Sequence, residues 1–356
     1  MIVHTVPALF DSDDGIIGGA ERYAFELARH MAERVSTTLV TYGAKDREQR
    51  VGRLRVRVIG HAWRVRGQVA NPLSLRLLPE LMKADVIHCH QQHIASSSVA
   101  AIAARLTGRR VFCSDLGGGG FDISSYLSTD GWYHGHLHIS EYSRHIFGHD
   151  RLPSAQVIWG GVDTGKFCPV PAIARSGRVL FVGRVLPHKG IDTILRGLPA
   201  GLALDIVGQV RHDRYLDDLK RLAEGKDVSF HHDWDDAAIV RAYQSALCVV
   251  LPSVYDDMYG GHSDVPELLG QTLIEGMACG TAAIGTRVAS IPEIVEDGVN
   301  GFLVPPNDPA ALGHALSRLA ADRALAARLG EEARQTVLRR FTWPAVVNAC
   351  LTRYGA

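Results

Sequence analysis

The sequence is short of several features, and each absence narrows what the protein can be. Its six cysteines are scattered without a C-x-x-C pair, and several lie in apolar runs, which predicts buried free thiols in a reducing compartment. No segment approaches the roughly 20 apolar residues that a membrane span needs. The 38 basic and 38 acidic residues cancel, so the net charge gives no argument for a nucleic-acid partner.

Two further sequence signals are absent, an amino-terminal targeting segment and a dinucleotide-binding fingerprint. The amino terminus has neither a basic segment nor a long apolar core, so we interpret it as a first strand and expect a cytoplasmic protein. The absence of a G-x-G-x-x-G fingerprint counts against a dinucleotide-dependent oxidoreductase. The chain of 356 residues, 46% hydrophobic and 21% charged, has the composition of a globular protein and is too long for one ordinary domain.

Predicted strands and helices alternate along the whole chain, which indicates α/β domains with parallel, doubly wound sheets. A proline-punctuated crossing around Pro169 and Pro171 marks a domain boundary. We therefore expect an amino-terminal domain at residues 1–168 and a second domain at residues 169–340. Residues 341–356 are expected to form a helix that packs back on the first domain.

The most informative stretch surrounds Gly270, which precedes an apolar helical pattern. The first amides of that helix, at Gln271 and Thr272, would face outward where the helix dipole favours an anion. Glu275 could accept hydrogen bonds from ribose hydroxyls, and Glu267 could reach a sugar hydroxyl beyond the phosphates. Taken alone, an ordinary αβ unit with two solvated glutamates explains this stretch better.

Other polar residues also follow predicted strands. Arg184 and, five residues later, Lys189 are a pair of cations that suits a diphosphate, although such residues in a turn usually belong to the surface. Trp234 could stack on a nucleotide base or belong to the core. Gly18 and Gly19 follow a strand and a polar loop and open an amphipathic helix. This is the phosphate-facing geometry of doubly wound folds, but glycines are also common in turns that bind nothing.

A buried strand ends in His88 and His90, with His93 close behind, and this spacing invites a metal site. No nearby carboxylate or cysteine completes a ligand set, so we predict structural histidines and no metal. Asp115 follows the next strand, directly before the glycines at 117–120. It could face a reacting sugar, or it could cap a flexible loop.

Arginines alternate with apolar residues over residues 53–58, which suits an edge strand with one wet face. Arg64 and Arg66 follow, and an apolar helix is predicted around residues 73–82. A basic patch beside an apolar helix could rest on an anionic membrane. A solvated edge strand next to a core helix explains the same pattern better.

In their order along the chain, these motifs resemble glycosyltransferase family 4 on the GT-B fold, in which two Rossmann-like domains face a central cleft. The resemblance covers nearly the whole chain and rests on the following segments: Gly18-Gly19-Ala20-Glu21, residues 85–90, Gly160-Gly161-Val162-Asp163 before Phe167, Gly183-Arg184 with Lys189-Gly190, Pro252-Ser253, Glu267 and Glu275 at E-x7-E spacing, Gly276-Met277-Ala278-Cys279-Gly280, Pro292-Glu293-Ile294-Val295 and Asp297-Gly298-Val299-Asn300-Gly301.

The resemblance implies a retaining, metal-independent hexosyltransferase that needs no cofactor. Its donor would be a nucleotide diphosphate sugar, with UDP favoured over GDP. The implied catalytic residues are Glu267, Arg184, Lys189 and Asp115, the last at a position where many relatives carry a histidine. The donor-binding residues, with Trp234 added as a base-stacking candidate, are Gly18, Gly19, Arg184, Lys189, Gly270, Gln271, Thr272, Glu275 and Trp234.

The acceptor stays open among glycans, lipid-linked glycans and small molecules, with peripheral contact at the inner face of a membrane as one option. Residues 254–266 form a longer loop than the family pattern, and this loop could set donor choice or be inert. The alternative functions are a non-catalytic nucleotide-sugar-binding subunit and a nucleotide-sugar epimerase with the same fold. The intact E-x7-E and Arg-x4-Lys patterns favour transfer over both.

Overall fold

The computed structural model describes residues 1–9, 18–117 and 123–355, and the chain divides into two compact units. The first unit comprises Met1–Gly161 together with Trp343–Ala356, and the second comprises Val162–Thr342. The chain passes between the units earlier than the boundary predicted after residue 168. Most of the polar loop predicted after the first strand, and the glycines at 118–120, lie outside the described residues.

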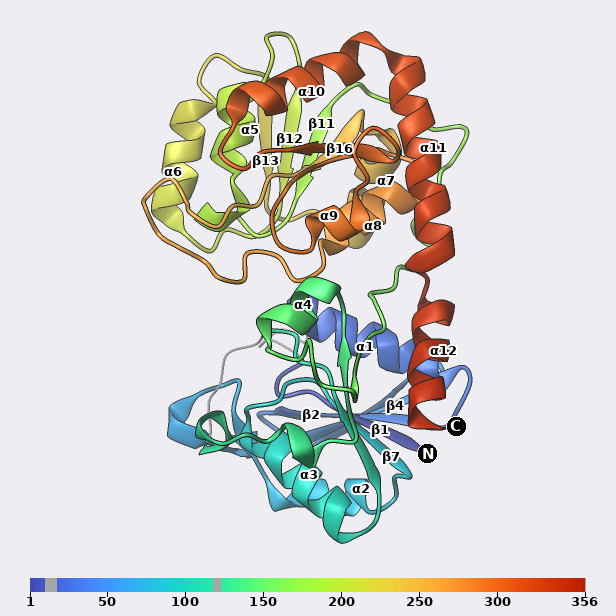
Figure 1. Ribbon diagram of the computed structural model, residues 1–356. Helices are drawn as coiled ribbons and strands as arrows, with labels where there is room; N and C mark the ends of the chain where they lie inside the picture. The colour runs from blue at the N-terminus through green and yellow to red at the C-terminus, as the bar shows by residue number, and fades with distance from the viewer. Residues whose placement is uncertain (10–17, 118–122, 356) are drawn as a thin grey trace. The chain divides into compact units, whose positions relative to one another are not determined.

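The first unit is built on one sheet in which all strand pairs are parallel except β3 with β4 (Figure 1). In spatial order its strands are β10 (Ala155–Val157), β9 (Gly135–His138), β8 (Arg110–Cys113), β7 (Val86–Cys89), β1 (Ile2–Thr5), β2 (Thr37–Gly43), β4 (Leu54–Gly60) and β3 (Arg47–Val51). Chain order reverses between β1 and β7, and such a switch point opens a crevice at the carboxyl ends of the strands.

Helices cover both faces of this sheet (Figure 1). The helices of the first unit are α1 (Gly19–Ala32), α2 (Leu78–Leu81), α3 (Ala95–Leu106), α4 (Glu141–Ile146) and α12 (Trp343–Tyr354). Its shorter elements are β5 (Trp63–Arg64), β6 (Pro72–Leu73), η1 (Val65–Gly67), η2 (Leu75–Leu77), η3 (Ile123–Tyr126) and η4 (Asp130–Trp132). Helix α1 packs against α12, and α2 packs against α3. The carboxyl-terminal helix therefore belongs to the first unit.

Local sequence explains several of these helices. The apolar face predicted for the first helix is buried in α1, including Leu27 and Met31. Ser140 caps α4, because its hydroxyl accepts a hydrogen bond from the Ser143 amide while the Ser143 hydroxyl accepts one from the Ser140 amide.

One prediction for residues 47–82 is wrong, and another gave too long an element. Strand β4 is not the edge, because β3 pairs with its outer side. The alternating arginines of β4 are instead held by carboxylates: Arg55 by Glu48 and Glu80, and Arg57 by Asp46. The helix predicted around residues 73–82 is shorter than expected, with η2 running into α2 over residues 75–81, because Pro72 and Leu73 pair as a strand with Trp63 and Arg64.

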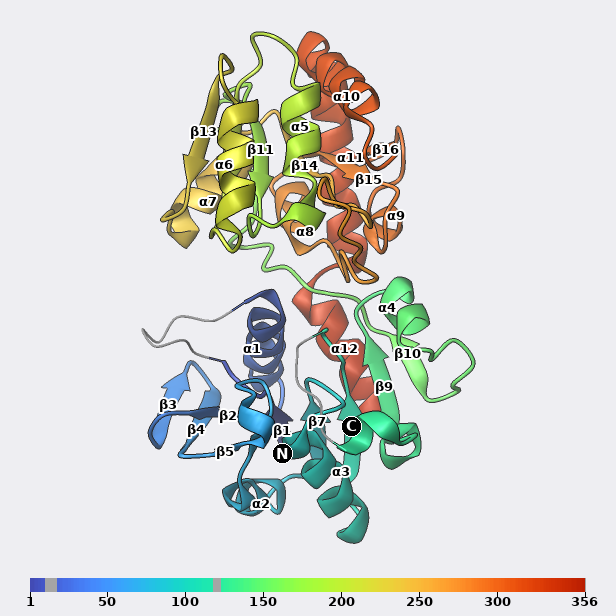
Figure 2. The same cartoon turned by 90° about the vertical axis from the view of Figure 1, so that its left-hand side faces the viewer.

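The second unit is a parallel sheet flanked by helices (Figure 2). In spatial order its strands are β13 (Val228–His231), β12 (Leu204–Val207), β11 (Val179–Val182), β14 (Cys248–Leu251), β15 (Ala282–Thr286) and β16 (Gly301–Val304). Its helices are η5 (Pro187–Lys189), α5 (Ile191–Gly197), α6 (Asp213–Leu222), α7 (Asp236–Ser245), α8 (Gln271–Ala278), α9 (Ile291–Ile294), α10 (Pro309–Ala321) and α11 (Arg323–Arg340). Helix α5 contacts α6 and α10, whereas α8 contacts α7 and α11.

Counted along the chain, the strand order of this sheet is 3-2-1-4-5-6, which is the doubly wound arrangement of dinucleotide-binding domains. Its switch point lies between β11 and β14. The predicted doubly wound α/β class is confirmed, and so is the helix start at Gly270. Among the described residues, none of the helices is both long and apolar enough to cross a bilayer.

Candidate functional site

Two loops meet at the switch point of the second unit, one after β11 and the other after β14. Gly190 ends the first loop with φ at +64°, and a Cβ atom on it would stand only 2.1 Å from the Pro252 carbonyl oxygen. The Val254 amide donates to the His188 carbonyl oxygen at 2.9 Å. This position therefore requires glycine, and the two loops are fixed against each other at the carboxyl edge of the sheet.

Lys189 and Glu267, one from each loop, form an ion pair in this contact. The Lys189 ammonium donates to Glu267 Oε2 at 2.7 Å and to the Pro266 carbonyl oxygen at 3.1 Å. The side chains are only 10% and 15% exposed, so little water screens the pair. Burial raises the pKa of Glu267, but the charge and hydrogen bond of Lys189 and the Gly270 amide outweigh it, so the net pKa lies below the usual range.

Helix α8 begins beside this pair. Gly270 adopts φ of +78° as its N-cap, and the Gly270 amide donates to Glu267 Oε1 at 3.0 Å. The amides of Gln271 and Thr272 belong to the first turn, where the helix offers no internal acceptor. The positive end of the helix dipole is therefore next to Glu267.

Glu275 lies one turn further along α8, where the hydroxyl of Tyr243 donates to its Oε2 at 3.1 Å. Tyr243 is fully buried on α7 and fixes the carboxylate from the neighbouring helix. Sequence analysis did not find Tyr243, because it named no helix between β13 and β14. The hydroxyl can orient Glu275 for hydrogen bonds to another group.

Arg184 and His188 complete the loop after β11. Arg184 is exposed, and among the described residues its guanidinium has no hydrogen bond or ion pair. Burial, reinforced by the charges of Lys189 and Arg184, lowers the pKa of His188 to about 4, so its imidazole is neutral at neutral pH. Sequence reasoning missed His188, although it lies between the two predicted cations. The loop thus presents one exposed and one buried cation next to a neutral imidazole.

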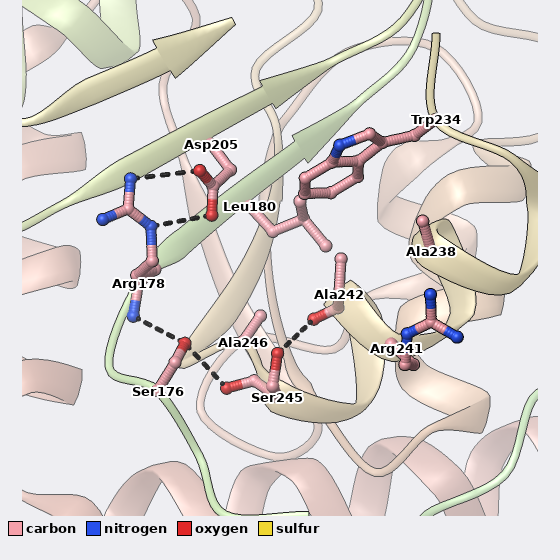
Figure 3. A pocket seen from close by; sticks show the side chains of 10 residues that line it. All are labelled: Ser176, Arg178, Leu180, Asp205, Trp234, Ala238, Arg241, Ala242, Ser245 and Ala246. Carbon is pink, nitrogen blue, oxygen red and sulfur yellow. Dashed lines mark hydrogen bonds and ion pairs between the residues drawn. The ribbon is translucent and has the colours of Figure 1, made fainter. Parts of the chain in front are cut away.

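Trp234 lies in a different set of contacts. Figure 3 shows its indole on the rim of a pocket over the sheet, with Ala238, Arg241 and Ala242 of α7. The indole stacks on His231, with ring centroids 4.0 Å apart. Neither Lys189 nor Glu267 lines this pocket. The structure therefore groups Trp234 with the pocket and not with the ion pair at the switch point.

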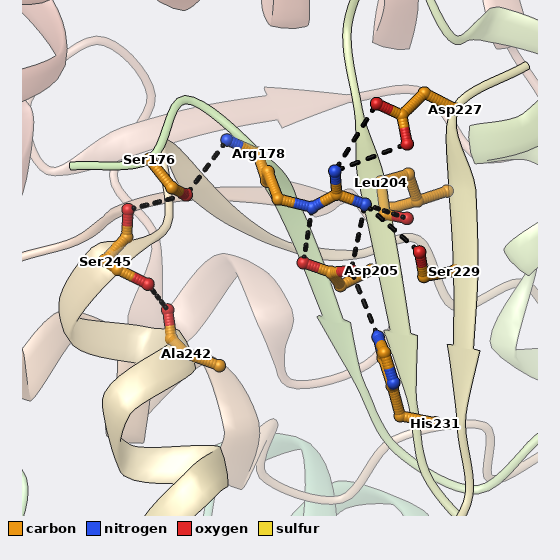
Figure 4. A network of polar contacts seen from close by, with 9 residues as sticks. All are labelled: Ser176, Arg178, Leu204, Asp205, Asp227, Ser229, His231, Ala242 and Ser245. Carbon is orange, nitrogen blue, oxygen red and sulfur yellow. Dashed lines mark hydrogen bonds and ion pairs between the residues drawn. The ribbon is translucent and has the colours of Figure 1, made fainter.

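Arg178 and Asp205, which line this pocket, belong to a polar network in which each charged group has a partner (Figure 4). Arg178 binds both carboxylate oxygens of Asp205, at 2.8 and 3.0 Å, and also contacts Asp227. His231 reaches Asp205 Oδ1 at 3.2 Å. This bidentate pairing joins β11 to β12 and accounts for these side chains as structural.

In the first unit, Asp115 follows β8 and organises the turn. Its carboxylate accepts the Gln92 amide at 3.2 Å and the Gly117 amide at 3.0 Å. Burial raises its pKa, although these two hydrogen bonds and the nearby His93 and His149 oppose the rise. These hydrogen bonds fit the interpretation that Asp115 caps a loop. They also hold its carboxylate at the carboxyl edge of the sheet. Gly18 is the N-cap of α1, and Gly19 is its first residue.

His88 of β7 and His90, just after that strand, belong to a buried cluster that sequence reasoning saw only in part. Parallel pairing brings His4 of β1 opposite His88, and His4 Nδ1 lies 2.9 Å from His90 Nε2. His88 contacts the Ser114 hydroxyl at 2.9 Å and the Tyr354 hydroxyl at 2.6 Å. Burial lowers the pKa of His4 to about 3, so that ring stays neutral. The cluster thus contains His4, which the sequence did not suggest, and not His93.

The loop at residues 254–266 is held to the body of the second unit. Tyr259 stacks on His212, with centroids 5.7 Å apart, and its hydroxyl donates to Asp218 of α6. At the tip, His262 bridges Asp256 at 2.6 Å and Asp264 at 3.2 Å. These contacts give the loop a defined conformation next to the segment that carries Glu267.

Comparisons with known proteins agree with this geometry. Residues 171–336 match the family model described as "Glycosyl transferases group 1", and residues 17–119 match the one described as "Glycosyltransferase Family 4". An uncharacterized glycosyltransferase of Methanocaldococcus jannaschii is 29% identical over 49% of this chain and 44% of its own length. The alpha-maltose-1-phosphate synthase of Mycobacterium tuberculosis is 29% identical over 76% of this chain and 79% of its own length.

The chain spans about half the length of the first of these curated relatives. Among solved structures, Anabaena HepE in complex with UDP superimposes with a TM-score of 0.77. Its identity is 19%, and the match covers 99% of both chains. At that identity the likeness concerns the fold alone.

Proposed function

The chain belongs to glycosyltransferase family 4 and has the GT-B fold, and from this premise we propose that it transfers a sugar from a nucleotide diphosphate sugar to an acceptor, with retention at the anomeric carbon and without a metal. The observation that carries the proposal is the Lys189–Glu267 ion pair beside the first turn of α8, at the switch point of a doubly wound sheet.

Such a reaction requires a nucleoside diphosphate to leave, and this group gains negative charge as its bond to the sugar breaks. Arg184 can provide a forked guanidinium, and Lys189 a compact charge with one of its three N–H donors not used by the two acceptors described above. The first turn of α8 adds backbone amides and a dipole that stabilise an anion by about 0.3–2 kcal/mol. These fixed charges would do the work of a divalent cation at the leaving group.

The two glutamates would hold the neutral parts of the donor. Glu267 stays ionised because its pKa is lowered, so it can accept a hydrogen bond from a sugar hydroxyl. Glu275, oriented by Tyr243, would accept hydrogen bonds from the ribose hydroxyls. The pairing of Lys189 with Glu267 links the two tasks, because one side chain would contact the phosphates while its partner contacts the sugar.

For the carrier we propose UDP. This is supported by Anabaena HepE, which was crystallised with UDP and with UDP-glucose, although the likeness to that chain is one of fold. The acceptor would be a glycan, a lipid-linked glycan or a small molecule. Asp115 would face the reacting sugar, and Gly18 and Gly19 would contribute to donor binding. Peripheral membrane contact is supported by two exposed apolar side chains beside the arginines, Trp63 at 65% and Leu75 at 70% exposure.

The first test is a thermal-shift panel with UDP, GDP, ADP and common nucleotide sugars in the presence of EDTA. A ligand at a hundredfold excess over its Kd stabilises the native state by about 2.7 kcal/mol, and we expect this with the UDP series. NMR analysis of the product should then show that the anomeric configuration of the new linkage, axial or equatorial, is the same as in the donor sugar. Inversion at the anomeric carbon would contradict the proposed stereochemistry.

A matched pair of glutamates tests the site itself. Glu275→Ala should raise the Kd for the nucleotide, whereas Glu296→Ala removes an exposed glutamate of the same unit and should leave it unchanged. If Glu275→Ala transferred sugar at the native rate, the ribose assignment would be wrong. Binding without transfer to any acceptor would favour a nucleotide-sugar-binding subunit, and conversion of the donor sugar without an acceptor would favour an epimerase.

A further inference from the structure

A second group of histidines lies in the first unit, outside every residue used above for donor binding. His136 and His138 alternate on β9, so their side chains project from the same face of the strand. His149 comes from the turn after α4, and Asp130 opens η4. Three separate segments of chain therefore converge on one point.

The donor atoms of three of these residues have the spacing of ligands around one ion. One ligand atom each from Asp130, His136 and His149 lies within 4.8 Å of the others. His149 Nε2 is 3.3 Å from Asp130 Oδ1, and the His136 and His149 rings are 4.2 Å apart. Ligands about 2.0–2.2 Å from a tetrahedral ion are about 3.3–3.6 Å from each other, so the Asp130–His149 spacing already suits coordination.

The surrounding side chains orient these donors. Gln92 Nε2 donates to Asp130 Oδ1 at 2.8 Å, and His138 Nε2 lies 3.0 Å from His149 Nδ1. A partner on Nδ1 leaves Nε2 of His149 aimed at Asp130. Metal-binding histidines commonly have such a partner on their second nitrogen, and metal-binding carboxylates are commonly hydrogen-bonded as well.

Hydrogen bonds among the described residues leave one nitrogen of an orienting histidine without a partner, while His136 Nε2 lies 3.3 Å from the Asp130 carbonyl oxygen. His136, His138 and His149 are each at most 4% exposed, and His138 Nδ1 is buried without a partner among the described residues. Burying three imidazoles costs solvation that an apolar cluster would not lose. The Asp130 side chain is 37% exposed, so an ion could enter from solvent on that side.

We propose that Asp130, His136 and His149 bind one divalent transition-metal ion of the Zn²⁺ class, with His138 and Gln92 as the groups that orient the ligands. Two imidazoles and one carboxylate are a donor set that suits Zn²⁺ and leaves a fourth position for water. The ion would join η4, β9 and the turn after α4. The ligands all belong to the first unit, whereas Lys189 and Glu267 belong to the second. Asp115, which accepts the Gln92 amide, is the residue of the proposed sugar site that adjoins the cluster.

The other cluster, formed by His4, His88 and His90, gives weaker support for a metal site than the group around His149. Both nitrogens of His88 already have hydrogen-bond partners, Ser114 and Tyr354, and no carboxylate belongs to that group. It also supplies the best control. His90→Gln removes one imidazole from it and should not change the metal affinity.

The experiment uses the full chain without a histidine tag, stripped with EDTA and passed into metal-free buffer. Titration with Zn²⁺ should give one ion per chain, and titration with Co²⁺ should give the intense visible absorption of a tetrahedral site. Asp130→Asn and His149→Gln should each weaken binding at least about tenfold, and Gln92→Leu should weaken it about 10–100-fold. His145→Gln, which removes an exposed histidine paired with Asp150, is the surface control.

Each outcome of these titrations supports or overturns the proposed metal site. Wild-type protein that binds no Zn²⁺ or Co²⁺ overturns the proposal. So does binding that is lost in His90→Gln and kept in His149→Gln. If a ligand variant fails to fold, ring-nitrogen NMR of the wild-type chain still distinguishes the sites, because Zn²⁺ should shift the signals of His136 and His149 and leave those of His4 and His90 in place.

Discussion

Replacing Lys189 with methionine tests the interaction on which the candidate site depends. The methionine side chain has a similar length and no charge, so Lys189→Met leaves the Glu267 carboxylate buried without its cation. Breaking one side of a buried pair in this way costs about 3–5 kcal/mol of unfolding free energy. Lys226→Met is the matched control, since Lys226 is an exposed lysine of the same unit that donates to the Leu195 carbonyl oxygen, and it should cost less than about 1 kcal/mol.

The direction of the Glu267 pKa shift determines how the stability deficit of Lys189→Met should change with pH. In the native protein the pKa of Glu267 lies below its ordinary value of 4.5, so its contribution is complete above pH 4.5 and is lost as the pH falls through the folded-state pKa. In Lys189→Met the largest remaining influence is burial, which raises the pKa above 4.5. The folded variant then takes up a proton before the unfolded chain does. Its stability deficit should therefore shrink as the pH is lowered from 7 to 5.

The assay is urea unfolding followed by circular dichroism at pH 7 and pH 5. Hydrogen exchange at the amides of α8 assigns the loss to the second unit, because two units can unfold in separate transitions. The double variant Lys189→Met with Glu267→Gln removes both charges and should recover about 2 kcal/mol relative to the sum of the single changes. A deficit that is the same at both pH values, or a Lys189→Met variant as stable as the native chain, would refute the reasoning.

Two further predictions concern the same site. Gly190→Ala should lower the unfolding free energy of the second unit by clearly more than the roughly 1 kcal/mol that a left-handed alanine costs, because its Cβ would meet the Pro252 carbonyl oxygen. Gly201 also has a positive φ but has open space around it, so Gly201→Ala should cost only that roughly 1 kcal/mol. Urea titration of both variants measures the difference. Tyr243→Phe removes the hydroxyl that orients Glu275 and should weaken nucleotide binding in calorimetry about three- to tenfold with little change in fold; unchanged affinity would show that Glu275 needs no such support.

Local sequence was sufficient for elements whose geometry depends on neighbouring residues. The strands at residues 204–207, 228–231 and 301–304 and the helix from Gln271 to Ala278 could be predicted because apolar periodicity and the flanking glycines determine them. The spacing of Glu267, Gly270 and Glu275 is likewise local, since all three lie within one loop and the helix that follows it.

Contacts between distant segments could not be predicted in this way. Lys189 meets Glu267 across 78 residues, and Tyr354 meets His88 across 266, because strand order brings β11 beside β14 and α12 onto the first sheet. The same reason explains the error at β4, whose partner β3 lacks the apolar alternation that marks a strand. A sequence pattern reports the period and the buried face of one segment. Which segments become neighbours depends on the winding of the whole sheet, and that winding decided where Lys189, His4 and Asp130 find their partners.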